Sequence, residues 1–213
     1  MRMAMPLFAR VTALDAIGPY EVLQRLPDAT VHFVGERAGA TVRTENGFLG
    51  LQTDLALGDL VDPDVVVVPG GIGTRALDAH HPITRWVAGA HAHTRFTTSV
   101  CTGSLVLAQA GLLAGLTATT HWSCRAELDA LGAVAVPQRI VEHLDRRIVT
   151  AAGVSSGIDM ALRLAAVLVD DLAARAMQLM IEYDPQPPFD SGDLADADAA
   201  LLERVKEYAA TKS

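Results

Sequence analysis

Cysteine is scarce in this chain, which has only Cys101 and Cys124 among its 213 residues. Two cysteines do not make a disulfide framework, so the fold must be held together by its hydrophobic core. Aromatic residues make up 5% of the chain and hydrophobic residues 50%, so the core consists mostly of Ala, Val, Leu and Ile. This composition is that of a globular protein and excludes a disordered one.

Positive charge and long apolar runs are scarce as well. The 17 Lys and Arg residues are outnumbered by 25 Asp and Glu residues, which gives a net charge of −8. The densest basic spot is the pair Arg146-Arg147, and this argues against nucleic acid as a partner. No run approaches the ~18 apolar residues of a membrane helix, and the apolar N-terminus lacks the cleavage site of a signal peptide. We therefore expect a cytoplasmic protein that binds neither membrane nor nucleic acid.

Strand patterns alternate with helix patterns, which predicts an α/β fold with a mostly parallel sheet. The run Asp64–Pro69 (DVVVVP) is typical of a strand buried on both faces, and Asn46-Gly47 predicts a hairpin within 41–51. The length fits one domain over 1–213, with 184–198 an extended Pro-rich acidic arm and 199–212 a C-terminal helix. Strands are expected at 5–11, 30–36, 64–69, 96–100, 117–120, 134–136, 139–141 and 147–150, and further helices at 18–26, 82–93, 105–113, 125–131, 157–170 and 172–183.

Several reactive or flexible residues follow the predicted strands. In open α/β sheets, ligands bind beyond the carboxyl ends of the strands. The predicted strands place four features at this edge: Asp15, the loop Gly70-Gly71, Cys101 and His121. We expect these residues to share one site.

Cys101 lies between a predicted strand and a predicted helix, in the sequence SVCTG. A nucleophile at such a junction sits on a sharp turn, the nucleophile elbow, which exposes its side chain. The helix N-terminus there favours a thiolate, the reactive form of cysteine. A backbone N–H of the Gly70-Gly71 loop and the N–H of Thr102 would together form an oxyanion hole. A lone cysteine is more often a small buried hydrophobe, but its place at the sheet edge favours catalysis for Cys101.

The other polar residues near this edge allow two interpretations each. Asp15 is either the N-cap of the following helix, which Gly18-Pro19 is expected to open, or an acid that shares a proton with Cys101. His121 is either a base or orienting group or a packed histidine. Cys124 has no elbow around it, so a structural role is favoured. The histidines show no metal-binding spacing.

The chain resembles the ThiJ/PfpI superfamily and, within it, the isonitrile hydratases. The resemblance covers nearly the whole chain and rests on LDAIGPYEVL (14–23), VVVVPGGIG (65–73), TSVCTGSLVLAQAGLLAG (98–115), ATTHW (118–122), AAGVSSGIDMAL (151–162) and QLMIEYDPQPPFDSG (178–192). The PGG loop and the elbow cysteine mark the superfamily, whereas the CTGS elbow, the Asp before GPYEV and the IEYDPQPPF segment mark the hydratases. Ala151-Ala152-Gly153 departs from the three glycines of these hydratases, which would alter substrate choice.

The resemblance implies a flavodoxin-like three-layer sandwich, a homodimer, and hydration of a small hydrophobic isonitrile to an N-substituted formamide without cofactor or metal. Cys101 would attack the isonitrile carbon, Asp15 would deliver and remove protons, and Thr102 would assist. The residues implied for oxyanion and substrate binding are Gly70, Gly71, His121, Gly153 and Val154.

Other cysteine-based functions fit less well. A glutamine amidotransferase needs a downstream His-Glu pair, and 153–159 contains no histidine. A PfpI-type peptidase has a histidine directly after the cysteine, where this chain has Thr102. A glyoxalase-like or deglycase-like enzyme using Asp15, Cys101 and His121 stays open, and so does a redox or stress sensor in which Cys101 is oxidised. A DNA-binding regulator is not expected, because the chain ends in an acidic segment and one helix.

Overall fold

The computed structural model describes residues 1–210. The described chain divides into two compact units, the first over Met1–Ile181 and the second beginning at Glu182. The first unit contains the central sheet and six helices, α1 to α6, and the second contains a 3₁₀ turn (Leu194–Asp196) and the helix α7 (Ala199–Ala210). Residues 211 and 212 of the expected C-terminal helix lie outside the described residues. The expectation of a single domain over 1–213 stays a prediction.

The first unit is built on a seven-stranded sheet with the order β10-β11-β7-β6-β1-β2-β5. All neighbouring strands are parallel except β10 and β11, which are antiparallel. The predicted α/β fold with a mostly parallel sheet is therefore confirmed. The strands of this sheet are β1 (Arg2–Pro6), β2 (Thr30–Gly35), β5 (Leu55–Ala56), β6 (Val65–Val68), β7 (Phe96–Val100), β10 (Ile140–His143) and β11 (Ile148–Ala151).

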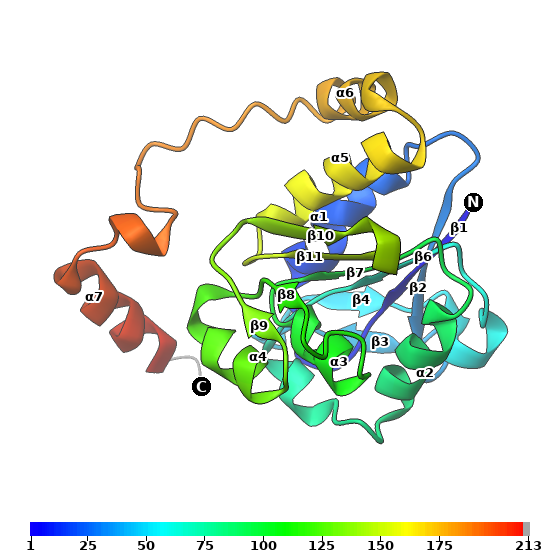
Figure 1. Ribbon diagram of the computed structural model, residues 1–213, viewed down its shortest axis with the longest axis horizontal. Coiled ribbons are helices and arrows are strands. Elements are labelled where there is room, and N and C mark those ends of the chain that lie inside the picture. The colour runs from blue at the N-terminus through cyan, green and yellow to red at the C-terminus, as the bar shows by residue number, and fades with distance from the viewer. Residues whose placement is uncertain (211–213) are drawn as a thin grey trace. The chain divides into compact units, whose positions relative to one another are not determined.

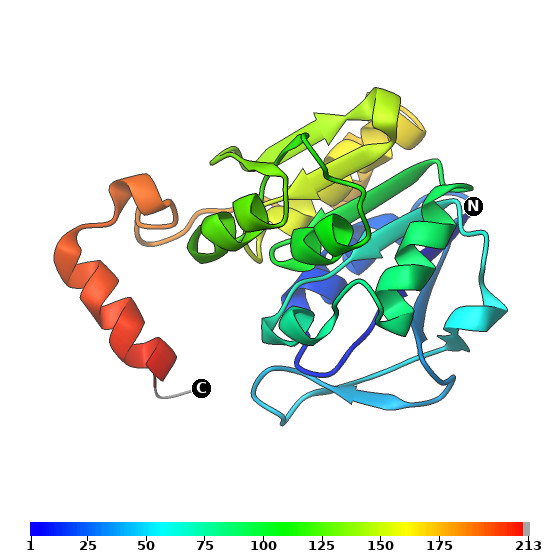
Figure 2. The same cartoon turned by 60° about the horizontal axis from the view of Figure 1, so that its bottom comes forward.

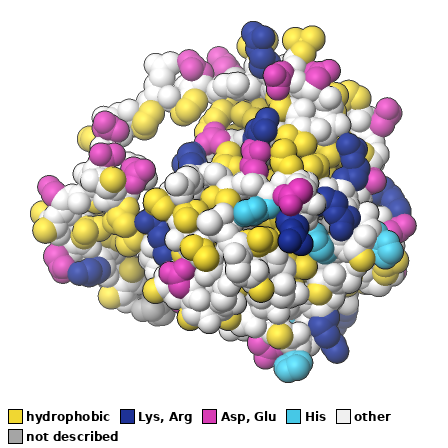
Figure 3. Space-filling view, viewed as in Figure 1, with side chains coloured by type: hydrophobic (Ala, Val, Ile, Leu, Met, Phe, Trp, Pro, Cys, Tyr) yellow, Lys and Arg dark blue, Asp and Glu magenta, His cyan; other side chains and the backbone are white. Residues whose placement is uncertain are grey.

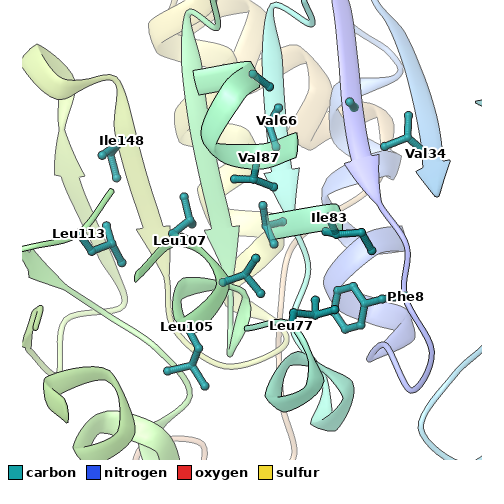
Figure 4. Close-up of a cluster of buried hydrophobic side chains, with 14 of the residues drawn as sticks. Phe8, Val34, Val66, Leu77, Ile83, Val87, Leu105, Leu107, Leu113 and Ile148 are labelled. Carbon is teal, nitrogen blue, oxygen red and sulfur yellow. The ribbon is translucent and has the colours of Figure 1, made fainter. Parts of the chain in front are cut away.

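Helices cover both faces of this sheet, as Figure 1 shows. The helices are α1 (Ala13–Leu23), α2 (Pro82–His91), α3 (Gly103–Gln109), α4 (Arg125–Ala130), α5 (Ser156–Leu168) and α6 (Asp171–Met180). Alternate residues of β6 point to opposite faces, as strand geometry requires. Val66 and Val68 pack in a core with α2, α3 and α4, whereas Val65 and Val67 pack in a second core with α1, α5 and α6. Figure 4 shows the first core, which includes Phe8, Leu77, Leu105 and Leu107. The run of four valines is thus buried on both faces, as predicted.

Two short pairs of strands complete the first unit. The predicted hairpin consists of β3 (Thr41–Arg43) and β4 (Gly50–Gln52), which are antiparallel, and it turns through Gly47 at φ 77°. Figure 2 shows this hairpin in light blue, below the strands of the main sheet. The other pair is β8 (Thr117–Ala118) with β9 (Val134–Ala135), which are parallel.

The first strand and helix differ from the prediction. β1 ends at Pro6 instead of Val11, and α1 begins at Ala13 instead of Gly18, so that Pro19 lies inside the helix. A proline there costs a helical hydrogen bond, but the site suits close packing against α5. A side chain at Gly18 would meet Ile158, and one at Gly157 would meet Pro19. Gly18-Pro19 therefore marks a close crossing of α1 over α5 and not a helix start.

The surface of the described chain shows no strong segregation of charge on the face in Figure 3, where Lys and Arg side chains are scattered among acidic ones. No helix within residues 1–210 is long and apolar enough to cross a membrane.

Candidate active site

The site lies where the strand order reverses. The chain passes from β1 to β2 and β5 on one side and then returns to form β6 on the other side of β1, which opens a crevice at the carboxyl ends of β1 and β6. Asp15 follows β1, Gly70 follows β6, and Cys101 follows β7, the next strand along. The topology thus brings together three of the predicted site residues.

Cys101 has a left-handed backbone conformation, with φ 57°. This conformation costs a non-glycine residue about 1–3 kcal/mol and persists only where neighbours hold it. The Cys101 N–H donates to the carbonyl oxygens of Ala151 and Ala152, at 3.0 and 2.9 Å. The hydroxyls of Ser104 and Thr120 both donate to the Cys101 carbonyl oxygen at 3.1 Å. The strand, the turn and the helix α3 therefore form an elbow, and Ala151-Ala152 serve as its backbone support.

Gly103 allows the elbow to pack against the neighbouring strand. A Cβ atom at this position would lie 2.1 Å from the carbonyl oxygen of Val68, which no packed structure tolerates. We expect Gly103→Ala to lower the free energy of unfolding by about 2 kcal/mol or more, because a backbone carbonyl has to move. Urea unfolding followed by circular dichroism measures this loss.

Gly89→Ala is the matched control for this substitution. Gly89 lies within α2, and a Cβ atom there would have nothing within 4 Å. Alanine is the better helix former, so this variant should gain roughly 0.5–1 kcal/mol. Equal stability of the two variants would contradict the packing assigned to Gly103.

Asp15 is completely buried in the first turn of α1 and faces Cys101. Its Oδ2 accepts a hydrogen bond from the Gly70 N–H at 2.9 Å, whereas Oδ1 has no nitrogen or oxygen partner among the described residues. Burial raises the pKa of Asp15 from 3.8 to about 7. The Gly70 N–H, the hydrogen bond to the Cys101 thiol and the charge of Glu45 make smaller contributions, the first two lowering the pKa and the third raising it. Thr12, not Asp15, occupies the N-cap position, so Asp15 does not cap the helix.

The sulfur of Cys101 lies in a buried environment, and the residue is 5% exposed. Its pKa is raised, mainly by burial and next by the negative charge of Asp15. The backbone N–H groups of Thr102 and Val154 donate to the sulfur and lower the pKa, but they do not outweigh burial. The N–H groups at the elbow thus favour the thiolate, as expected, whereas burial and the charge of Asp15 favour the thiol more strongly. At neutral pH, the two acids hold at least one proton between them, since two adjacent buried charges are too costly.

The loop after β6 binds the elbow through its backbone. The Gly71 N–H donates to Thr102 Oγ1 at 2.8 Å, and the Thr102 hydroxyl donates to the Gly71 carbonyl oxygen at 3.0 Å. The Gly71 N–H is thus bound to the Thr102 side chain and is not free to form the expected oxyanion hole with the Thr102 N–H. The N–H groups that reach the sulfur come from Thr102 and Val154. Gly70 permits this close approach, because a Cβ atom there would lie 2.6 Å from the Thr102 nitrogen and 2.7 Å from Asp15 Oδ2.

His121 lies against the loop that carries Val154. A Cβ atom at Gly153 would be 2.7 Å from His121 Cδ2, so the ring packs directly on this glycine. Its Nδ1 lies 2.7 Å from Ser123 Oγ and accepts a longer bond from the Ser123 N–H. Burial lowers the pKa of His121, which favours the neutral ring. His121 therefore caps the short helix that follows it, and no described hydrogen bond joins it to Cys101.

Cys124 and Glu45 complete the surroundings of the site. The Cys124 sulfur is buried and accepts a hydrogen bond from the Arg75 guanidinium at 3.2 Å, which fits a structural cysteine. The sequence did not predict Glu45 as a residue of the site, because it directly precedes the Asn46-Gly47 turn and matches no functional motif. In the structure its carboxylate accepts a hydrogen bond from the Ile72 N–H, next to the Gly70-Gly71 loop.

Such an arrangement supplies a nucleophile and a proton carrier in contact with each other. The thiol can transfer its proton to the Asp15 carboxylate as the sulfur attacks an electrophile, and Asp15 can pass that proton on. The thiolate that forms is stabilised by the Thr102 and Val154 N–H groups.

Known proteins resemble this chain over most of its length. It is 42% identical to an isonitrile hydratase of Pseudomonas putida over 204 residues, which cover 96% of this chain and 88% of that protein. It is 30% identical to the HTH-type transcriptional regulator CdhR of Pseudomonas aeruginosa, over 85% of this chain but 52% of the regulator.

A solved structure supports the same relationship. The crystal structure of a ThiJ/PfpI family protein from Pseudomonas syringae superimposes with a TM-score of 0.90 at 35% identity and covers 99% of this chain and 86% of that one. Drosophila melanogaster DJ-1beta, at 20% identity and a TM-score of 0.76 over 86% of this chain and 98% of that one, shares the fold. The DJ-1/PfpI family model matches residues 1–167, which include the elbow, the acid and the loop after β6. The chain belongs to the DJ-1/PfpI family.

Proposed function

We propose that this protein is an isonitrile hydratase, which adds water to R–N≡C to give the formamide R–NH–CHO. The observation that carries the proposal is the buried pair Asp15–Cys101 in a chain that is 42% identical to a hydratase of this kind over nearly its full length. An isonitrile carbon accepts both a nucleophile and a proton, and the pair supplies one of each.

The first step forms the C–S bond. Asp15 as carboxylate accepts the proton of the Cys101 thiol, the sulfur attacks the terminal carbon, and the proton passes from Asp15 to that carbon. The product is the thioimidate R–N=CH–S–Cys101, in which every atom of the thiol and the isonitrile is retained. Asp15 returns to the carboxylate form.

The second step consumes water. Asp15 takes a proton from a water molecule as its oxygen adds to the thioimidate carbon, and the nitrogen receives that proton. The resulting R–NH–CH(OH)–S–Cys101 collapses to R–NH–CHO as the C–S bond breaks. The hydroxyl proton passes through Asp15 to the departing sulfur, so the thiol is restored and the reaction balances without a cofactor or a metal.

Residues around Asp15 and Cys101 have supporting roles in this proposal. The Thr102 and Val154 N–H groups stabilise the sulfur, the Gly70 N–H orients Asp15, and Gly71 orients Thr102. His121 and Gly153 pack next to Val154 and bound the substrate space. Three apolar residues adjoin site residues in the sequence and are more than a third exposed, which suits a hydrophobic R group: Leu14, Ile72 and Trp122.

Two further expectations belong to the same proposal. We place the enzyme in the cytoplasm, because the sequence has neither a long apolar run nor a signal-peptide pattern. We expect a homodimer, as the superfamily resemblance implies. Sedimentation velocity of the purified full chain measures the oligomeric state.

A redox sensor fits this site less well than an enzyme does. Sensor cysteines are accessible and have a low pKa, whereas Cys101 is buried and its pKa is raised. The deciding experiment incubates the protein with a small and a bulky alkyl isonitrile and quantifies the formamide by chromatography. A parallel incubation with methylglyoxal tests the glyoxalase alternative. Lactate without formamide would replace the proposal by that alternative.

A further inference from the structure

Three successive backbone N–H groups of the loop 70–72 donate to three side chains from different parts of the chain. Gly70 donates to Asp15 Oδ2 at 2.9 Å, Gly71 donates to Thr102 Oγ1 at 2.8 Å, and Ile72 donates to Glu45 Oε1 at 3.0 Å. The first two partners belong to the site already described. The third, Glu45, has no role in the proposed reaction.

The backbone of Glu45 is itself attached to the segment that leads into α1. The Glu45 N–H donates to the Val11 carbonyl oxygen at 3.2 Å, and Thr44 forms a parallel bridge with Val11. The Arg10 N–H donates to the Arg43 carbonyl oxygen at 2.8 Å. The hairpin β3–β4 is therefore hydrogen-bonded to residues 10 and 11, a few residues before Asp15. The Glu45 side chain connects the same hairpin to the loop 70–72.

We propose that Glu45 is a positioning residue of the active site, whose carboxylate fixes the loop that orients Asp15 and Thr102 and adds a negative charge to the rim of the site. The inference rests on the proposed function, since it assigns Glu45 to the same reaction. It also explains why a loop residue of a surface hairpin accepts a hydrogen bond from the backbone next to a buried acid.

The charges around Glu45 support an electrostatic part of this role. Its charge is among the causes that raise the pKa of Asp15, and it raises the pKa of His121 against the larger effect of burial. Arg75 and Arg125 act on His121 in the opposite direction. Cys101 contacts Asp15 from the elbow. The Arg43 guanidinium, on the same hairpin, donates to the Phe48 carbonyl oxygen, and no described ion pair joins it to Glu45.

Two substitutions separate the hydrogen bond from the charge. Glu45→Gln keeps an oxygen acceptor for the Ile72 N–H and removes the charge. We expect its kcat at high pH to stay within about 2-fold of the wild type, while the acid limb of its pH profile moves to lower pH by roughly 0.5 unit, as expected for one carboxylate at a high effective dielectric constant. Glu45→Ala removes both the hydrogen-bond acceptor and the charge. It should lower kcat about 10-fold or more, because Asp15 is no longer held in place to carry the proton. KM should change less, because Glu45 does not position the substrate.

Asp59→Asn is the matched control. Asp59 also accepts a hydrogen bond from a backbone N–H, that of Ala56 at 2.9 Å, and its substitution removes the same charge from another part of the chain. This variant should keep both the wild-type kcat and the wild-type pH profile. A kcat for Glu45→Ala that matches the control, or an unshifted acid limb for Glu45→Gln, overturns the proposal.

A measurement without isonitrile separates this inference from the proposed function. The rate at which iodoacetamide alkylates Cys101, followed by mass spectrometry of the peptide, depends on the protonation of the Asp15–Cys101 pair. The acid limb of this rate should shift to lower pH in Glu45→Gln and stay in place in Asp59→Asn. If the wild type forms no formamide but the alkylation profile shifts, Glu45 keeps its positioning role and the substrate assignment fails. If formamide forms and neither profile shifts, the Glu45 assignment fails alone.

Discussion

Replacing Cys101 by serine abolishes formamide formation, with an expected loss of roughly 10³-fold or more in kcat, as is typical when a covalent nucleophile is removed. A serine hydroxyl ionises far less readily than a thiol, and Asp15 alone cannot activate it in a buried site. The fold should persist, because the serine oxygen can accept the same N–H bonds from Thr102 and Val154 that the sulfur accepts. The measurement is the initial rate of formamide formation at saturating isonitrile, with circular dichroism to confirm the fold.

Cys124→Ser is the control for this prediction. Cys124 is buried as well, but its sulfur accepts a hydrogen bond at 3.2 Å from the Arg75 guanidinium, which also binds Glu127. Turnover should survive this substitution while Cys101→Ser loses it. A Cys101→Ser variant that retains more than about a tenth of the wild-type rate would remove covalent catalysis from the proposed function.

Elements with strong local signals were predictable from the sequence. The strand 96–100 has the predicted bounds, and the valine run and the Asn46-Gly47 hairpin lie where their patterns place them. These features depend on residues close together in the chain: apolar runs that fit a doubly covered strand, and a turn that needs φ > 0. The edge of the sheet that holds Asp15, Gly70 and Cys101 follows from the same alternation, because parallel strands end together.

Features that depend on distant partners were not predictable. Pro19 resembled a helix start, and only the contact of Gly18 with Ile158 shows why it lies within α1. The Gly71 N–H resembled a free donor, but its partner is a hydroxyl 31 residues away. Glu45 had no signal at all, since its hydrogen bond to Ile72 spans 27 residues. The raised pKa of Cys101 likewise results mainly from burial, which local sequence patterns do not predict.

Asp15→Asn should lower kcat about 10²–10⁴-fold, the range typical for the loss of a general acid–base group. The asparagine amide oxygen can still accept the Gly70 N–H, so the geometry persists while the proton carrier is lost. In the wild type, kcat/KM should fall below an apparent pKa of about 7, because a protonated Asp15 cannot accept the thiol proton. The Asn variant should lose this acid limb together with its activity.

The same substitution should make the protein more stable at alkaline pH. The pKa of Asp15 is raised from 3.8 to about 7 in the folded state, so the folded protein binds this proton more tightly than the unfolded chain does. The wild type therefore loses stability as the pH rises from 3.8 to 7, and the loss is complete above pH 7. Between pH 5 and pH 8, this loss amounts to at most about 3 kcal/mol, and Asp15→Asn should lack it. Urea unfolding of both proteins at the two pH values measures the difference. Parallel pH dependence of the two proteins would show that Asp15 is ionised throughout this range, and it would contradict the raised pKa of Asp15.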